Sequence, residues 1–213
     1  MKTEDLVTML ATGAEAVEPR AAVCRYAGAV GAGVIIAAML MAALLGVNTN
    51  LVRSASVPMV WAKFAFVSWL FVGALLATLR LGRPGASLTA MPGALAAPLL
   101  GMWVLAAVTF VGTARAQWLE LVLGQTAAVC PFAIAMLGTP VFFGGLWAMQ
   151  GLAPTRLRLA GAGVGLLAGT AGAFMYAFHC PELAAPFLGT WYVLGMALPT
   201  ALGALIGPRV LRW

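Results

Sequence analysis

Six long apolar stretches constrain this chain more than any other feature of its sequence. Each is about 20 residues long, and a helix of that length, rising 1.5 Å per residue, crosses a hydrocarbon layer of ~30 Å. The stretches are residues 26–47, 59–79, 91–111, 126–149, 159–178 and 184–206. The sequence therefore predicts an all-α fold, a polytopic bundle of six transmembrane helices.

The composition excludes a soluble protein. Of 213 residues, 63% are hydrophobic and 8% charged, and the mean hydropathy is +1.01, whereas soluble domains carry about 25% charged residues. The longest connection between apolar stretches is about a dozen residues, too short for a soluble catalytic domain. We expect two parts, a cytoplasmic acidic segment at residues 1–25 and a transmembrane domain at residues 26–213.

The basic residues predict the orientation of the bundle. Nine lie at one predicted end and three at the other. The nine are Lys2, Arg20, Arg25, Arg80, Arg83, Arg156, Arg158, Arg209 and Arg212; the three are Arg53, Lys63 and Arg115. The positive-inside rule then places both termini in the cytoplasm of a bacterium and the protein in its inner membrane. We interpret the net charge of +6 as a topology signal with contact to membrane lipids, and not as evidence of direct nucleic-acid binding.

The first nineteen residues carry a different charge. Four carboxylates against Lys2 give this segment a net charge of −3. Thr3 is a suitable N-cap, Glu4 and Asp5 complement the helix dipole, and Gly13 can end a short helix. Its apolar residues are Leu6, Val7, Met9 and Leu10. We expect this helix to dock in a groove on a partner protein; the alternative is a helix lying on the membrane surface, which its acidity disfavours.

Two features inside the predicted spans have structural explanations. Gly161, Gly165 and Gly169 recur at four-residue spacing, which favours close helix packing over a substrate path. Lys63 lies one turn from the outer end of its span, so we expect its stem to snorkel to the headgroups, with Glu120 or Glu182 as partner. No Asp, Glu or His lies in the middle of a span, which disfavours an ion-coupled transporter.

Two Cys-Pro steps place thiols at the predicted outer face. Cys130 lies near the outer end of the fourth span, and Cys180, flanked by His179 and Glu182, lies in the turn between the fifth and sixth. Three interpretations remain open: unrelated packing cysteines, a disulfide, or a labile pair that reacts with an oxidant or a soft metal. Cys130, Cys180 and His179 lack a fourth ligand, which disfavours a structural zinc site. Binding of another metal ion by the two thiols is left open. Cys24 lies at the cytoplasmic end.

The chain lacks the usual catalytic signatures. It has no Cys-x-x-Cys, GxGxxG, Walker, HExxH or GxSxG pattern. We therefore predict a protein that is not an enzyme and needs no cofactor. The alternatives are a small transporter or efflux protein and a thiol-dependent membrane oxidoreductase.

Several stretches resemble the NrsF family of bacterial membrane anti-sigma factors. The most specific are GLAPT at residues 151–155 and HCPELAAPF at residues 179–187; others are residues 2–6, 10–14, 17–20, 58–63, 129–131 and 191–196. The resemblance implies that the N-terminal segment holds an extracytoplasmic-function (ECF) sigma factor inactive at the membrane. It also implies that Cys130 and Cys180 sense envelope stress such as oxidants or heavy-metal ions, and it assigns no role to Cys24.

We take an inner-membrane anti-sigma factor as the leading hypothesis. In it, Leu6, Val7, Met9 and Leu10 are the apolar anchors for the sigma factor, and Glu4 and Asp5 are the charge partners. A change at Cys130 and Cys180 moves the fourth helix against the turn that follows the fifth, and this movement changes the affinity of the segment for the sigma factor.

Overall fold

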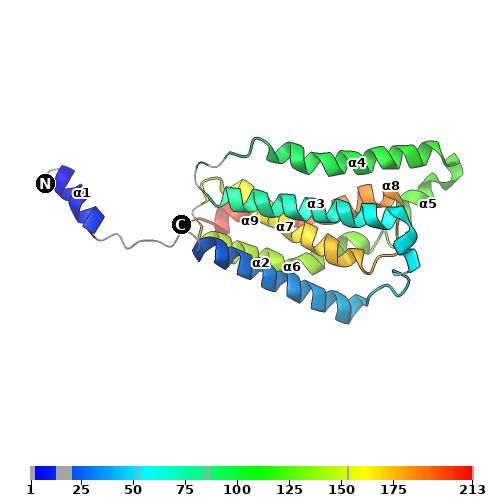
Figure 1. The fold of residues 1–213 in the computed structure, drawn as a ribbon, viewed down its shortest axis with the longest axis horizontal. Helices are drawn as coiled ribbons and strands as arrows, with labels where there is room; N and C mark the ends of the chain where they lie inside the picture. Colours follow the sequence, from blue (N-terminus) through cyan, green and yellow to red (C-terminus); the bar gives the residue numbers. More distant parts are fainter. Residues whose placement is uncertain are drawn as a thin grey trace.

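The computed structural model describes residues 3–12, 21–51, 53–83, 85, 87–152 and 154–212 (Figure 1). Within these ranges every regular element is helical. The long helices are α2 (Ala21–Leu40), α3 (Pro58–Leu81), α4 (Met91–Val111), α6 (Cys130–Gln150), α7 (Leu157–Ala177) and α9 (Val193–Val210). The short elements are α1 (Thr3–Thr12), η1 (Met41–Leu45), η2 (Arg53–Ser56), η3 (Arg115–Gln117), α5 (Trp118–Leu123), α8 (Ala185–Phe187) and η4 (Leu188–Tyr192).

The predicted six-helix bundle is confirmed. Six helices are long and apolar enough to cross a membrane: Val23–Leu45, Pro58–Leu81, Met91–Val111, Cys130–Gln150, Leu157–Ala177 and Ala185–Val210. The largest differences from the predicted bounds are in the fourth span, which begins at Cys130 because residues 124–129 form a turn, and in the sixth span, which continues to Val210. The final span is continuous only because α8 and the π-helical segment η4 lead directly into α9.

Helix α7 is the centre of the bundle. It packs against α9, α6 and α3, and α2 packs mainly on α6. Helix α4 lies on the outside, against α3 and α8 (Figure 1). Most side chains of α7 are buried, while α4 buries only Met102 and Ala106. The most enclosed part of the protein is therefore the helix that ends next to Cys180.

Glycines line the contact between α7 and α9. A Cβ at Gly161 would meet the carbonyl oxygen of Gly203, and one at Gly165 would meet that of Pro199. A Cβ at Gly169 would lie 2.7 Å from Met196 Cα. The two backbones touch along this seam because neither helix places a side chain between them. The glycine stripe thus lies in a closed helix–helix contact.

Helix α1 lies apart from the bundle, beyond the end at which α2 begins (Figure 1). The predicted N-terminal helix is present as α1, from Thr3 to Thr12. Three residues named in the sequence analysis lie outside the described residues: Lys2, Gly13, which was predicted to end the helix, and Arg20.

Candidate functional site

The two Cys-Pro thiols lie in the same buried cluster. Cys130 is the first residue of α6, and Cys180 lies in the 178–184 turn that follows α7. Both are buried and neither forms a disulfide. Thr126 contacts both: its carbonyl accepts the Cys130 N–H (2.9 Å), and its Oγ1 lies 3.9 Å from Cys180 Sγ. Two cysteines fifty residues apart are therefore brought together under the 124–129 turn.

Lys63 of α3 ties the thiol-bearing turn to the bundle. Its Nζ donates to the carbonyl oxygens of Cys180 (2.6 Å) and Glu182 (3.3 Å) and lies 5.7 Å from the centre of the Tyr192 ring. The ammonium is also close enough to both thiols for electrostatic interaction. Within the described residues, Lys63 is the one charged side chain that is fully buried, 1% exposed.

The expected snorkelling of Lys63 is wrong. The side chain turns inward, and its partner is the backbone of Glu182 rather than its carboxylate. An ammonium is costly to bury without acceptors, and the irregular 178–184 turn supplies them because its carbonyls are not used in a helix. The sequence places Lys63 near the outer end of its span, but it could not predict the acceptors, because these carbonyls come from a distant turn.

Two tyrosines enclose the thiols on the side of α7 and η4. The Tyr176 carbonyl accepts the Cys180 N–H (2.9 Å), and the Tyr176 and Tyr192 rings lie 6.0 Å apart. Tyr192 Oη is buried and interacts with the Cys180 side chain, which lies in the same cluster, but it forms no hydrogen bond of regular geometry with any described residue. A buried hydroxyl with so weak a partner is uncommon. Thr126, Tyr176 and Tyr192 were not predicted, because nothing in their local sequence distinguishes them from packing residues.

His179 and Glu182 hold the same turn from its outer side. His179 Nδ1 donates to the Gly46 carbonyl (2.9 Å) at the end of η1. Glu182 Oε1 accepts the Gln125 N–H (2.7 Å) in the turn above Cys130. The 178–184 turn is therefore attached to the end of η1 through Gly46, to α3 through Lys63 and to the 124–129 turn before α6 through Gln125.

The described residues contain no group of three His, Cys, Asp or Glu side chains able to hold a metal ion. His179 therefore does not join Cys130 and Cys180 in a three-ligand set. Cys24 is exposed near the start of α2, at the opposite end of the bundle. Chemically, the site is an enclosed pair of free cysteines with one buried cation. Its reactivity requires access, since buried thiols are inert.

The predicted docking face is exposed. Leu6, Val7 and Met9 project from α1, with Met9 68% exposed. Glu4 and Asp5 lie in the first turn, where Glu4 complements the helix dipole and its carbonyl accepts the Thr8 hydroxyl (2.9 Å). Leu10, the fourth predicted anchor, is also part of α1. The helix offers carboxylates and uncovered apolar side chains at the end of the chain away from the thiols.

Comparison with known proteins gives a consistent picture. The family model described as "NrsF: Negative regulator of sigma F" matches residues 10–213. A protein of Azospira oryzae named "Probable anti-sigma-F factor NrsF" is 52% identical over 213 residues, covering the whole of both chains. The "Anti-sigma-F factor NrsF" of Caulobacter vibrioides is 34% identical over 229 residues, again covering both chains. No solved structure matches.

Proposed function

The chain belongs to the NrsF family of negative regulators of sigma F, and from this membership we infer that it is an anti-sigma factor whose partner is a sigma factor. We propose further that the partner is of the ECF type and that the protein holds it at the bacterial inner membrane. On this proposal the protein is a regulator rather than an enzyme, and the two ends of the bundle have different tasks. One end binds the sigma factor, and the other receives an envelope signal.

The sigma factor binds to residues 1–25, above all to α1. The supporting observation is the apolar group Leu6, Val7 and Met9, which is exposed on a helix whose first turn is acidic. A ten-residue helix is marginal alone in water, so burying this group on a partner supplies the stabilisation that the isolated helix lacks. Glu4 and Asp5 add charge complementarity to basic surfaces of the partner.

A double substitution on α1 tests this docking. Leu6→Glu/Met9→Glu removes two apolar anchors, each worth about 1.5–3 kcal/mol when fully buried, and we expect binding to weaken by more than roughly 100-fold. The readout is co-purification of the sigma factor with the full-length protein in detergent. Thr12→Ala, on the same helix, is the matched control. If the double variant retains the sigma factor as well as the control does, α1 is not the docking segment.

The signal acts on Cys130 and Cys180. A peroxide or hypohalous oxidant takes two electrons from the pair, an S–S bond forms, and both thiol protons are released. A soft heavy-metal ion instead binds both sulfurs and displaces the same two protons. The observation that supports this proposal is that Cys130 and Cys180, both free cysteines, lie in one cluster beside Lys63. His179 contributes by tying the turn to Gly46.

The bundle provides a route from the thiols to the other end. Pulling Cys180 toward Cys130 displaces the turn that Lys63 and His179 hold, and with it the end of α7. Helix α7 packs along α9, α6 and α3. A shift of the α7 end next to Cys180 is therefore passed to these helices, which extend to the end of the bundle where α2 begins. A coupling of about 1.4 kcal/mol changes sigma-factor affinity tenfold.

Promoter activity tests the sensor. Cells carry the wild type, Cys130→Ser/Cys180→Ser or the control Cys24→Ser, with and without hypochlorite or cadmium. We expect the wild type and Cys24→Ser to release the sigma factor on treatment, and the double variant to stay locked in one state. A double variant that represses and releases like the wild type would show that the thiols only pack.

A further inference from the structure

The end of the bundle opposite the thiols is strongly basic. Seven described arginines lie there: Arg25, Arg80, Arg83, Arg156, Arg158, Arg209 and Arg212. From residue 21 onward the only carboxylate side chains are those of Glu120 and Glu182, and both lie at the thiol end. The basic end therefore has no carboxylate of the bundle to neutralise it.

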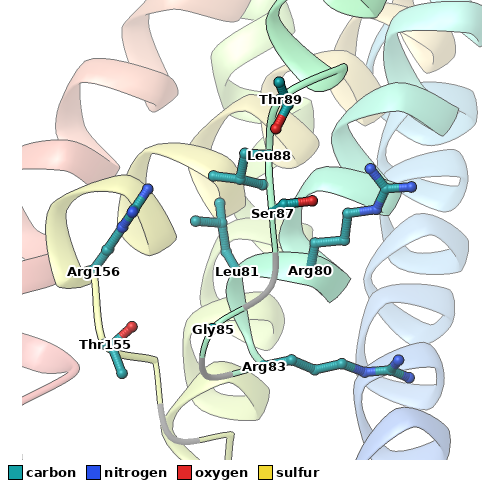
Figure 2. Close-up of a pocket in the computed structure, with 9 residues that line it drawn as sticks. All are labelled: Arg80, Leu81, Arg83, Gly85, Ser87, Leu88, Thr89, Thr155 and Arg156. Atoms are coloured by element: carbon teal, nitrogen blue, oxygen red, sulfur yellow. The ribbon is translucent and has the colours of Figure 1, made fainter.

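A cavity of about 480 Å³ opens at this end, between the 82–90 loop after α3 and the segment before α7. Figure 2 shows Arg80 and Arg83 extending toward the same side, with the Ser87 hydroxyl beside Arg80. Arg156 lies on the other side of Leu81 and Leu88 from Arg80 and Arg83. The complete lining is Arg80, Leu81, Arg83, Gly85, Ser87, Leu88, Thr89, Thr155 and Arg156.

The three cavity arginines differ from Arg25 in their contacts. Arg25 stacks 4.7 Å from the centre of the Trp147 ring and reaches the Trp147 carbonyl. Across the part of the chain that the structure describes, Arg80, Arg83 and Arg156 form no ion pair. No carboxylate among the described residues pairs with these three guanidinium groups, so the cavity has donors for an anion from Arg80 and Arg83 on one side and from Arg156 on the other.

We propose that this cavity binds a phosphate group, that of an anionic phospholipid headgroup. Guanidinium forks and hydroxyls match phosphate oxygens, and the cavity offers Ser87, Thr89 and Thr155 as hydroxyl donors. Arg80 lies in the last turn of the apolar helix α3, which is the depth of the headgroups if α3 crosses the membrane. The carboxylates Glu4 and Asp5 belong to α1, the helix that Figure 1 shows apart from the bundle.

Native mass spectrometry of the full-length protein tests the site. Detergent-solubilised protein is incubated with phosphatidylglycerol, with phosphatidylcholine, or with inorganic phosphate. Arg80→Gln/Arg156→Gln removes two charges from the cavity, and Arg158→Gln/Arg209→Gln removes two from the same end outside it. Ser87→Trp fills the cavity and keeps every charge. Thermal unfolding of each variant in phosphatidylcholine checks that the bundle is intact.

We expect phosphatidylglycerol to be retained by the wild type and by the Arg158/Arg209 control. It should bind at least tenfold more weakly to the Arg80/Arg156 variant, since each charge-assisted phosphate contact is worth about tenfold. It should bind as weakly to Ser87→Trp, because the indole occupies the cavity. Inorganic phosphate binding as tightly as the lipid would support a phosphate site and assign it to a soluble anion. Equal losses in both double variants would mean nonspecific attraction to a basic surface and would overturn the proposal, as would unchanged binding in Ser87→Trp.

Discussion

The buried Lys63 is the residue that best connects the outer turn to the helices. Two carbonyls of the 178–184 turn converge on its Nζ, and the Tyr192 ring lies beside it. Removing one partner of a buried hydrogen bond leaves the other unsatisfied, which costs about 1–3 kcal/mol. The two carbonyls could regain partners only if the turn opened to solvent.

Lys63→Met should therefore loosen the turn over Cys180. We expect a lower unfolding temperature and faster modification of Cys180 by a maleimide in a variant with no other cysteine. Arg53→Met is the control, because it removes an exposed cation at the same end of the bundle. Equal maleimide rates for Lys63→Met and Arg53→Met would show that Lys63 does not hold the turn.

Among the elements, the pair α7 and α9 depends most on small residues. Close backbone approach stabilises helix pairs in membranes through van der Waals contact, because lipid gives no hydrophobic force between helices. At Gly165 an added methyl group would meet the backbone of Pro199 and Thr200. At Gly101 in α4 the same methyl group would meet nothing within 4 Å.

Gly165→Ala and Gly101→Ala form a matched pair of tests. Gly165→Ala forces α7 and α9 apart and should destabilise the bundle by about 1–3 kcal/mol. Gly101→Ala should leave stability unchanged or raise it slightly, because alanine favours the helix. Unfolding followed by tryptophan fluorescence in mixed micelles measures both. A Gly165→Ala protein as stable as Gly101→Ala would mean that the seam relaxes without cost.

For the whole molecule, the unequal distribution of arginines predicts the orientation. The basic end should face the cytoplasm and the thiol end the exterior. Arg115 and Arg158 are both exposed and lie at opposite ends. In a cysteine-free background, we expect Arg115→Cys to react with a membrane-impermeant maleimide in intact cells and Arg158→Cys to react only after lysis. The reverse pattern would place the thiols in the cytoplasm and remove the basis for an envelope sensor.

The number, type and approximate bounds of the long helices could be read from the sequence. In hydrocarbon each backbone N–H and C=O must be satisfied within its own segment, so a run of about 20 apolar residues determines a helix locally. The same holds for the glycine spacing in α7, because residues four apart share one helix face. The positions of Cys130 and Cys180 near one end followed from the chain order alone.

Only the tertiary structure determined which side chains meet at that end. The long helices are apolar on nearly every face, so their sequences carry little information about which face packs inward. The contacts of Lys63 with Cys180, of Thr126 with Cys180 and of His179 with Gly46 join residues from separate turns and helices. The cavity beside Arg80 and Arg156 likewise depends on how two loops lie against each other. Such contacts follow from packing of the whole bundle, since no local pattern in the sequence encodes them.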